Sequence, residues 1–222
     1  MNNFLLIVQW ILQIFLIILI IFLVYSQIII RIIRKYYKFP IPGFLTKIID
    51  NAFRRKFIQK PWLIAERMSL EPGMVVVEIG PGKGSYTKKV AEKVLPGGKV
   101  YAIDIQESVI ESLKKRIEKE GISNIIPKID NAYNFSFETQ SIDRIFAITC
   151  LPEIPEPVKA LSECKRILKS DGIISFCELA LDPDYVWRKT EKKWAKKAGL
   201  NFHEGFGNWF TYQLNFKKKS EE

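Results

Sequence analysis

Hydrophobic and polar positions divide the chain into three parts with different patterns. Between Asn2 and Ile30 no side chain is charged, and Ile, Leu, Phe and Val predominate. As a helix, residues 4–30 would extend about 40 Å, enough to cross a bilayer core of roughly 30 Å with some tilt. A cleaved signal peptide would show a basic start and a small-residue cleavage site, and neither is visible. A surface helix would need a polar face. The pattern predicts a transmembrane anchor over residues 1–38.

The second part, residues 39–70, begins with FPIPG, a sequence that interrupts helices. In the stretch FLTKIIDNAFRRKFI that follows, apolar residues recur at helical spacing. The charged side chains on the opposite face are Lys47, Asp50, Arg54 and Arg55. We expect a basic amphipathic helix, either packed on the domain with a solvated outer face or lying in the lipid interface. A second short helix is expected at residues 61–70.

The third part, residues 71–222, alternates short apolar runs with helical patterns. Buried strands are predicted at residues 74–79, 99–103, 124–129, 144–148 and 173–177, and helices at 85–94, 107–120, 158–168 and 185–198. Alternation of this kind predicts an α/β domain with a doubly wound parallel sheet and helices on both faces. Residues 201–207 and 208–216 resemble two further strands with a turn at Gly205–Asn208, so the seven-stranded sheet should end in an antiparallel hairpin.

The net charge of +10 is concentrated beside the apolar segment. Residues 31–60 hold nine basic side chains and one acid, which is +8 and leaves +2 for residues 61–222. Basic residues beside a span mark its cytoplasmic side, and each contributes about 1 kcal/mol of attraction to an anionic leaflet. We therefore expect a single-pass protein of the lipid bilayer whose large domain is cytoplasmic. No nucleic acid partner is expected, because the domain itself is nearly neutral.

The cysteines and the histidine argue against a metal centre. Cys150, Cys164 and Cys177 are odd in number and widely spaced, so they predict neither a disulfide framework nor a metal-binding motif. His203 is the only histidine of the chain, and a histidine-based metal site is therefore not expected.

The stretch VVVEIGPGKGSYT, Val75–Thr87, places three glycines at the first strand-to-helix turn of the predicted sheet. Ligands of such sheets bind beyond the carboxyl ends of the strands, where helix N-termini present free amides. Glycine lets the backbone turn sharply and approach a ligand closely. The second strand ends in Asp104, and a carboxylate there can accept hydrogen bonds from both hydroxyls of a ribose. These features together predict a site for an adenosine-containing ligand.

The spacing of the glycines distinguishes between such ligands. Dinucleotide sites use G-x-G-x-x-G around a pyrophosphate. This chain has G-P-G-K-G, with Glu78 two residues before the first glycine. A carboxylate so close would repel phosphate and suits a ligand that carries an ammonium group. Glycines that serve tight packing or an NAD site are the alternative at this point.

At these residues the sequence resembles the class I S-adenosylmethionine-dependent methyltransferases, in particular the type 11-like members with the motif acid-x-Gly-x-Gly-x-Gly. The resemblance covers residues 61–217, and three further motifs match in order: Asp130-Asn131-Ala132 at the acidic turn beside adenine, SIDRIFAIT at the fourth strand, and ALSECKRILKSDGIISF at a helix-turn-strand. Ser170-Asp171-Gly172 departs from the Pro-Gly-Gly of the family. The resemblance implies a Rossmann-like fold and S-adenosyl-L-methionine as the cofactor.

The resemblance also implies roles for individual residues. The residues expected at the cofactor are Glu78, Gly80, Pro81, Gly82, Gly84, Asp104, Ile105, Asp130, Asn131, Ala132 and Thr149. Among them the glycines would cradle the methionine part, Glu78 would contact its amino group, Asp104 the ribose, and Asp130 with Ala132 the adenine. Two strand-end acids that cap helices are the alternative for Glu78 and Asp104.

Methyl transfer from a sulfonium requires positioning, desolvation and, for some acceptors, removal of a proton. The loop after the fourth strand, Thr149–Glu153, should face the transferred methyl. Glu153 is the candidate base, with a solvated or capping acid as the alternative. Cys150 is expected to be a small apolar filler rather than a reactive thiol.

The same loop bears on the acceptor. Relatives of the rRNA adenine dimethylases share the spelling EIGPGKG but carry an Asn/Asp-Pro-Pro-Tyr-like motif, which LPEIPEP is not. The loop is more similar to that of menaquinone-type methyltransferases. A tethered domain samples mainly the membrane surface. We therefore expect a membrane-resident acceptor, such as a phospholipid amine headgroup, a quinone or a hydrophobic thiol. A protein methyltransferase acting on membrane partners and a non-catalytic scaffold are the alternatives.

Overall fold

The computed structural model describes residues 3–38 and 50–219 of the chain. Internal contacts divide the chain into two compact units, Met1–Lys38 and Phe39–Glu222. The described part of the first unit is a single helix, α1 (Asn3–Tyr36), which confirms the predicted helix and extends it at its C-terminal end. Its segment Phe4–Arg34 is long and apolar enough to cross a membrane.

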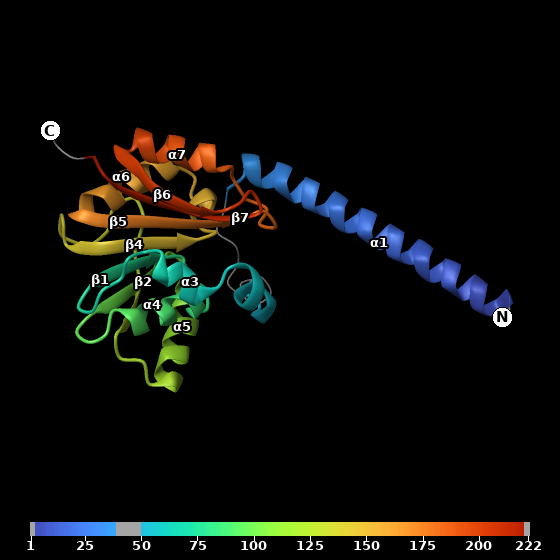
Figure 1. Ribbon diagram of the computed structural model, residues 1–222, viewed down its shortest axis with the longest axis horizontal. Helices are drawn as coiled ribbons and strands as arrows, with labels where there is room; N and C mark the ends of the chain where they lie inside the picture. Colours follow the sequence, from blue (N-terminus) through green and yellow to red (C-terminus); the bar gives the residue numbers. More distant parts are fainter. Residues whose placement is uncertain (1–2, 39–49, 220–222) are drawn as a thin grey trace. The chain divides into compact units, whose positions relative to one another are not determined.

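The second unit is built on a seven-stranded sheet (Figure 1). Its strands are β1 (Val75–Ile79), β2 (Lys99–Asp104), β3 (Ile125–Ile129), β4 (Ile142–Ile148), β5 (Leu168–Leu179), β6 (Leu200–Gly207) and β7 (Thr211–Lys218). They lie in the order β3-β2-β1-β4-β5-β7-β6. The first five are parallel, and β7 runs antiparallel to β5 and β6. This arrangement confirms the predicted α/β fold and its closing hairpin.

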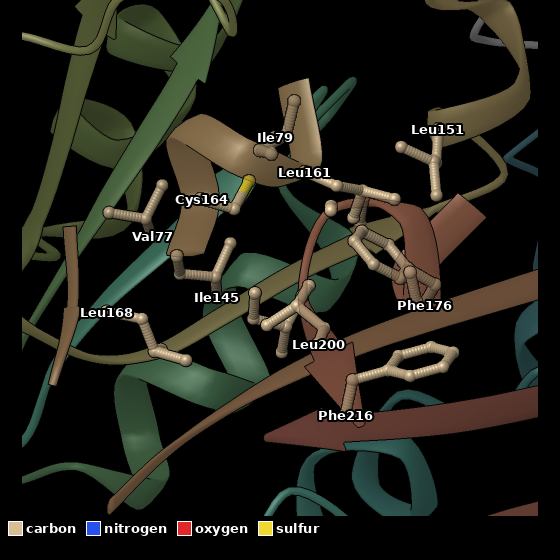
Figure 2. Close-up of a cluster of buried hydrophobic side chains, with 14 of the residues drawn as sticks. Val77, Ile79, Ile145, Leu151, Leu161, Cys164, Leu168, Phe176, Leu200 and Phe216 are labelled. Carbon is tan, nitrogen blue, oxygen red and sulfur yellow. The ribbon is translucent and has the colours of Figure 1, made fainter. Parts of the chain in front are cut away.

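Helices cover both faces of the sheet (Figure 1). The helices of one face are α3 (Pro61–Glu66), α4 (Ser85–Lys93) and α5 (Glu107–Glu120), and those of the other face are α6 (Pro157–Ile167) and α7 (Arg188–Lys197). Because side chains of a strand alternate between faces, Val76 packs in the core beneath α4, and Val77 packs in the core beneath α6. Figure 2 shows the second core, where Leu161 and Cys164 of α6 meet side chains of the sheet.

The hairpin turn begins three residues after its predicted start. Gly205 is part of β6 and pairs with Leu214, where a β-carbon would lie 2.9 Å from the Leu214 Cδ2 atom. The chain turns at residues 208–210 instead, because the side chain of Asn208 accepts hydrogen bonds from the amides of Phe210 and Thr211, at 2.9 and 3.3 Å. Such a turn is a typical use of asparagine, whose side chain imitates the backbone.

The predicted amphipathic helix is only partly within the described residues, since its residues 44–49 lie outside them. Ala52 and Phe53 are helical and lead into a short π-helix, η1 (Arg54–Ile58). Its packing reverses the expectation of a helix packed through its apolar face: Arg54 is 5% exposed, whereas Phe53 and Phe57 are 65% and 58% exposed. Arg54 turns inward because its Nε donates to Gln59 Oε1 (2.7 Å) and its Nη2 to Thr149 Oγ1 (3.0 Å).

Candidate active site

A cavity with two lobes lies beyond the carboxyl ends of β1, β2 and β4. The lobes share walls at Gly80, Asp104, Gln106, Cys150 and Glu153, so they form one elongated cavity. Glu78 lines the first lobe, together with Pro81 and Gly82. Ile105, Asp130, Asn131 and Ala132 line the second. The structure therefore brings together the two acids and the glycine turn that the sequence placed at the ends of neighbouring strands.

Glu78 is the buried carboxyl of the first lobe. It leaves β1 on the side of α4, where the hydroxyl of Thr87 donates a hydrogen bond to it. Burial raises the pKa of Glu78 to about 8, against the opposing effect of the Thr87 hydrogen bond and with a further contribution from the charge of Asp50. At neutral pH the carboxyl is therefore mostly protonated, and a cation beside it would ionise it.

Contacts within the protein itself require glycine at two positions of the glycine turn. Gly80 and Gly84 have φ angles of +70° and +75°, in the left-handed region that favours glycine. A β-carbon at Gly80 would lie 2.5 Å from Cys150 Sγ, and one at Gly84 would lie 2.5 Å from Leu113 Cδ1. Gly84 is the N-cap residue of α4. The turn thus packs against the loop after β4 and against α5, and it leaves the backbone at Gly80 and Gly82 bordering the cavity.

Asp104 ends β2 at the junction of the two lobes. One of its carboxylate oxygens accepts a hydrogen bond from the amide of Gln106 (2.8 Å), the residue that precedes α5. Burial raises the pKa of Asp104, and hydrogen bonds from the backbone of Gln106 and Ile105 oppose this effect. Asp104 therefore fixes the turn that leads into α5 without capping the amides of that helix, and it lies in a position suited to a ribose between the lobes.

The second lobe is walled largely by apolar side chains, among them Ile79, Ile103 and Ile154. At its edge Asp130 organises a turn, because its carboxylate accepts hydrogen bonds from the Asn131 amide (2.9 Å) and from the amide and hydroxyl of Ser136 (3.1 and 2.6 Å). Burial raises the pKa of Asp130, but the hydrogen bonds from Ser136 and Asn131 and the charge of Lys128 together outweigh it, so the net pKa lies below its usual value. This lobe suits a flat, mostly apolar ring such as adenine.

The loop after β4 forms part of the wall of both lobes. Thr149 is buried and has a φ of +49°, a conformation that is rare for a β-branched residue and is found most often at functional sites. Burial raises the pKa of the Cys150 thiol well above its usual value, so the thiol stays protonated, in agreement with its expected role as a filler. Glu153 lies in the short 3-10 helix η2 (Leu151–Glu153) and borders both lobes.

Several residues of the first lobe were not predicted as site residues, among them Arg54, Tyr86 and Asp182. Tyr86 is 6% exposed, and its hydroxyl has no hydrogen-bond partner within the described part of the chain. A buried hydroxyl without a partner costs free energy, so it suits a site that receives a polar ligand group. Its place two residues after the last glycine is a signal that could have identified it, whereas Arg54 and Asp182 reach the cavity only through tertiary packing.

These features fit S-adenosylmethionine part by part. The buried carboxyl of Glu78 and the hydroxyl of Tyr86 suit its amino-acid end, Asp104 suits its ribose, and the apolar second lobe suits its adenine. Among residues 3–38 and 50–219, no group of three or more His, Cys, Asp or Glu side chains could hold a metal ion.

Comparisons with known proteins agree with this assignment. Residues 70–216 match the family described as "Methyltransferase domain". The catalytic subunit of a tRNA (adenine(58)-N(1))-methyltransferase from Yarrowia lipolytica is 27% identical over 62% of this chain and 35% of its own length. A ubiquinone/menaquinone biosynthesis C-methyltransferase from Bordetella parapertussis is 30% identical over 54% of this chain and 48% of its own length. The chain thus spans half or less of these relatives.

Solved structures agree on the fold. An S-adenosylmethionine-dependent methyltransferase from Aquifex aeolicus has a TM-score of 0.73 and 22% identity, over 80% of this chain and 98% of the other. A methyltransferase solved with S-adenosylhomocysteine has a TM-score of 0.59 and 18% identity, over 72% of this chain and 54% of the other. Since the family match covers more than half of the chain and the cavity suits the cofactor, the protein belongs to the S-adenosylmethionine-dependent methyltransferases.

Proposed function

We propose that the protein is a membrane-anchored methyltransferase that acts on a membrane-resident small molecule or lipid. The observation that carries this proposal is the combination, in one chain, of the cofactor cavity with α1, whose segment Phe4–Arg34 has the length and hydropathy of a membrane span. The basic residues that follow this segment favour a cytoplasmic methyltransferase domain.

The acceptor classes that we propose are a phospholipid amine headgroup, a quinone and a hydrophobic thiol. Two relatives support this range by their names, the ubiquinone/menaquinone C-methyltransferase and a phosphoethanolamine N-methyltransferase from Caenorhabditis elegans that is 29% identical over 46% of this chain. Because one of the relatives is a tRNA methyltransferase, RNA is the alternative acceptor that the experiment must distinguish from a lipid.

The residues of the site have distinct tasks in this proposal. The cofactor, when bound, supplies a methyl group that is already activated by its sulfonium, so the protein contributes mainly position and exclusion of water. Glu78 orients the amino-acid end, and Asp104 orients the ribose. Glu153, which borders both lobes, accepts the proton of an acceptor that must lose one.

Labelled S-adenosylmethionine, incubated with the full-length protein and total membranes, tests the acceptor class. We expect label in the organic extract and none in the RNA or protein fractions. Asp104→Ala should abolish incorporation, whereas Asp171→Asn, which alters an exposed acid near the amino-terminal end of β5, should not change it. Label found only in RNA or only in protein would refute the lipid assignment and identify the acceptor class.

A further inference from the structure

A second hollow opens beside the first lobe of the cavity, between η1 and the segment that leads from β5 toward α7. Its apolar walls are Phe53, Ile58, Leu179, Leu181 and Pro183. We propose that this hollow, the tail groove, binds the hydrocarbon tail of an amphiphilic acceptor whose polar head lies in the first lobe beside the loop Thr149–Glu153, next to the amino-acid end of the cofactor. This inference rests on the proposed membrane-resident acceptor and specifies its chemistry.

The tail groove lies next to the first lobe of the donor cavity. Arg54 and Asp182 border both the groove and the first lobe, so the two hollows meet at this pair of residues. The Arg54 guanidinium lies 3.0 Å from Thr149 Oγ1 in the loop that borders the donor cavity. A molecule that entered the first lobe with its reactive end would therefore have its remaining part directed into the groove.

The lining changes from charged to apolar side chains between the first lobe and the tail groove, as an amphiphilic acceptor requires. Charged side chains, Arg54 and Asp182, mark the junction, and the remaining walls are apolar except for Asn51. At the outer end, Phe53 and Leu181 are 65% and 61% exposed, and the ring of Phe57 lies 5.0 Å from that of Phe53. Clustered exposed apolar side chains beside a polar site are typical of surfaces that bind an apolar ligand or a membrane.

The reversed packing of η1 supports a hydrocarbon occupant. The inward turn of Arg54 supplies the charged junction, and the same helical turn then leaves Phe53 on the groove wall and Phe57 exposed. The two alternative occupants of the groove are residues 39–49 of the same chain and a second copy of the protein. The border that the groove shares with the donor cavity at Arg54 and Asp182 favours the acceptor over both.

Photochemical labelling of the full-length protein in lipid nanodiscs tests the proposal. The probe is a long-chain fatty acid that carries a diazirine at the end of its chain, and adducts are located by mass spectrometry after digestion. We expect adducts within residues 50–58 and 179–183, in addition to adducts in α1, which serve as the internal standard for probe inside the bilayer.

Two exposed leucines provide the variant and its matched control. Leu181→Asp places a charge on the groove wall and should lower the groove adducts at least tenfold relative to those in α1. Leu95→Asp alters a leucine that is 49% exposed, after α4 at the opposite edge of the sheet, and should leave both sets of adducts unchanged. Because both side chains are exposed, neither variant should impair folding.

Several results would overturn the tail groove. Adducts confined to α1, or groove adducts that persist at the wild-type level in Leu181→Asp, would exclude it. If the groove gives no adducts and the Leu181→Asp variant melts at a lower temperature than the wild type, the result would indicate that residues 39–49 fill the groove. A variant that dissociates during gel filtration would indicate a second copy.

The same samples separate this inference from the proposed function. Lipid methylation without groove adducts would reject the groove and retain the lipid acceptor. Groove adducts together with label transferred only to RNA or protein would reject the lipid acceptor and, with it, the assigned role of the groove.

Discussion

Replacement of Glu78 by glutamine tests the electrostatics of the donor cavity directly. The carboxyl is 1% exposed, and its pKa rises from 4.5 to about 8 because of burial. A carboxyl whose folded pKa is raised contributes stability that is fully present below its unfolded pKa. This contribution is lost as the pH rises from 4.5 through about 8, because the unfolded chain releases the proton that the folded protein retains.

The expected effect on stability follows from these two pKa values. At pH 7 the unfolded carboxyl is about 2.5 pH units above its pKa, and at about 1.4 kcal/mol per unit the wild type loses about 3 kcal/mol of unfolding free energy relative to pH 4.5. Glutamine has nearly the same shape and does not titrate. The stability of Glu78→Gln relative to the wild type should therefore increase by about 3 kcal/mol between pH 4.5 and pH 7.

The same substitution, which should favour the folded protein more at pH 7 than at pH 4.5, should weaken its binding of the cofactor. With a pKa of about 8, roughly nine tenths of the Glu78 carboxyls are protonated at pH 7, and the ammonium group of the cofactor favours the ionised form. Binding should therefore release protons at pH 7. Loss of a charge-assisted hydrogen bond, worth about 1.5–3 kcal/mol, should weaken binding by Glu78→Gln roughly ten- to a hundredfold and abolish the proton release.

Two measurements on the full-length protein in detergent check these expectations. Urea unfolding, followed by tryptophan fluorescence at several pH values, gives the stability difference. Titration calorimetry in buffers of different ionisation enthalpy gives the affinity and the protons released. Glu111→Gln, an exposed acid on α5, is the matched control and should behave as the wild type. A stability difference that does not vary with pH, or equal proton release by Glu78→Gln and the wild type, would refute the assignment.

Three further substitutions follow from the structure. Gly80→Ala forces a β-carbon to within 2.5 Å of Cys150 Sγ at a positive φ, so the protein should lose about 1–3 kcal/mol of stability; an unchanged melting temperature would contradict this. Asp104→Asn should weaken cofactor binding about tenfold, as measured by calorimetry. If the variant and the wild type bind the cofactor with equal affinity, Asp104 does not contact the cofactor. Burial raises the pKa of Glu191 to about 8 beside the buried Glu178. The wild type therefore loses stability as the pH approaches 8, and Glu191→Gln should raise the melting temperature more at pH 8 than at pH 5, whereas an equal rise at both would argue against a raised pKa.

Local patterns were sufficient for most of the fold. The bounds of α5 agree with the prediction, and β1 to β4 agree within two residues, because hydrophobic periodicity is a property of neighbouring residues. The closeness of Glu78 to Asp104 can also be predicted from the sequence. Both residues lie at or near the carboxyl ends of parallel strands, and such ends share one edge of the sheet.

Contacts between distant parts of the chain account for what local patterns missed. The sequence shows Arg54 on the polar face of an amphipathic segment, and it turns inward because Gln59 and Thr149, the latter 95 positions away, accept its hydrogen bonds. The same long-range packing brings Asp182 to the cavity and forms the tail groove. Periodicity thus reveals which elements form and which of their ends meet. Which side chains fill the space between those elements depends on contacts with residues that are distant in the sequence. The local pattern does not contain the identity of those distant residues.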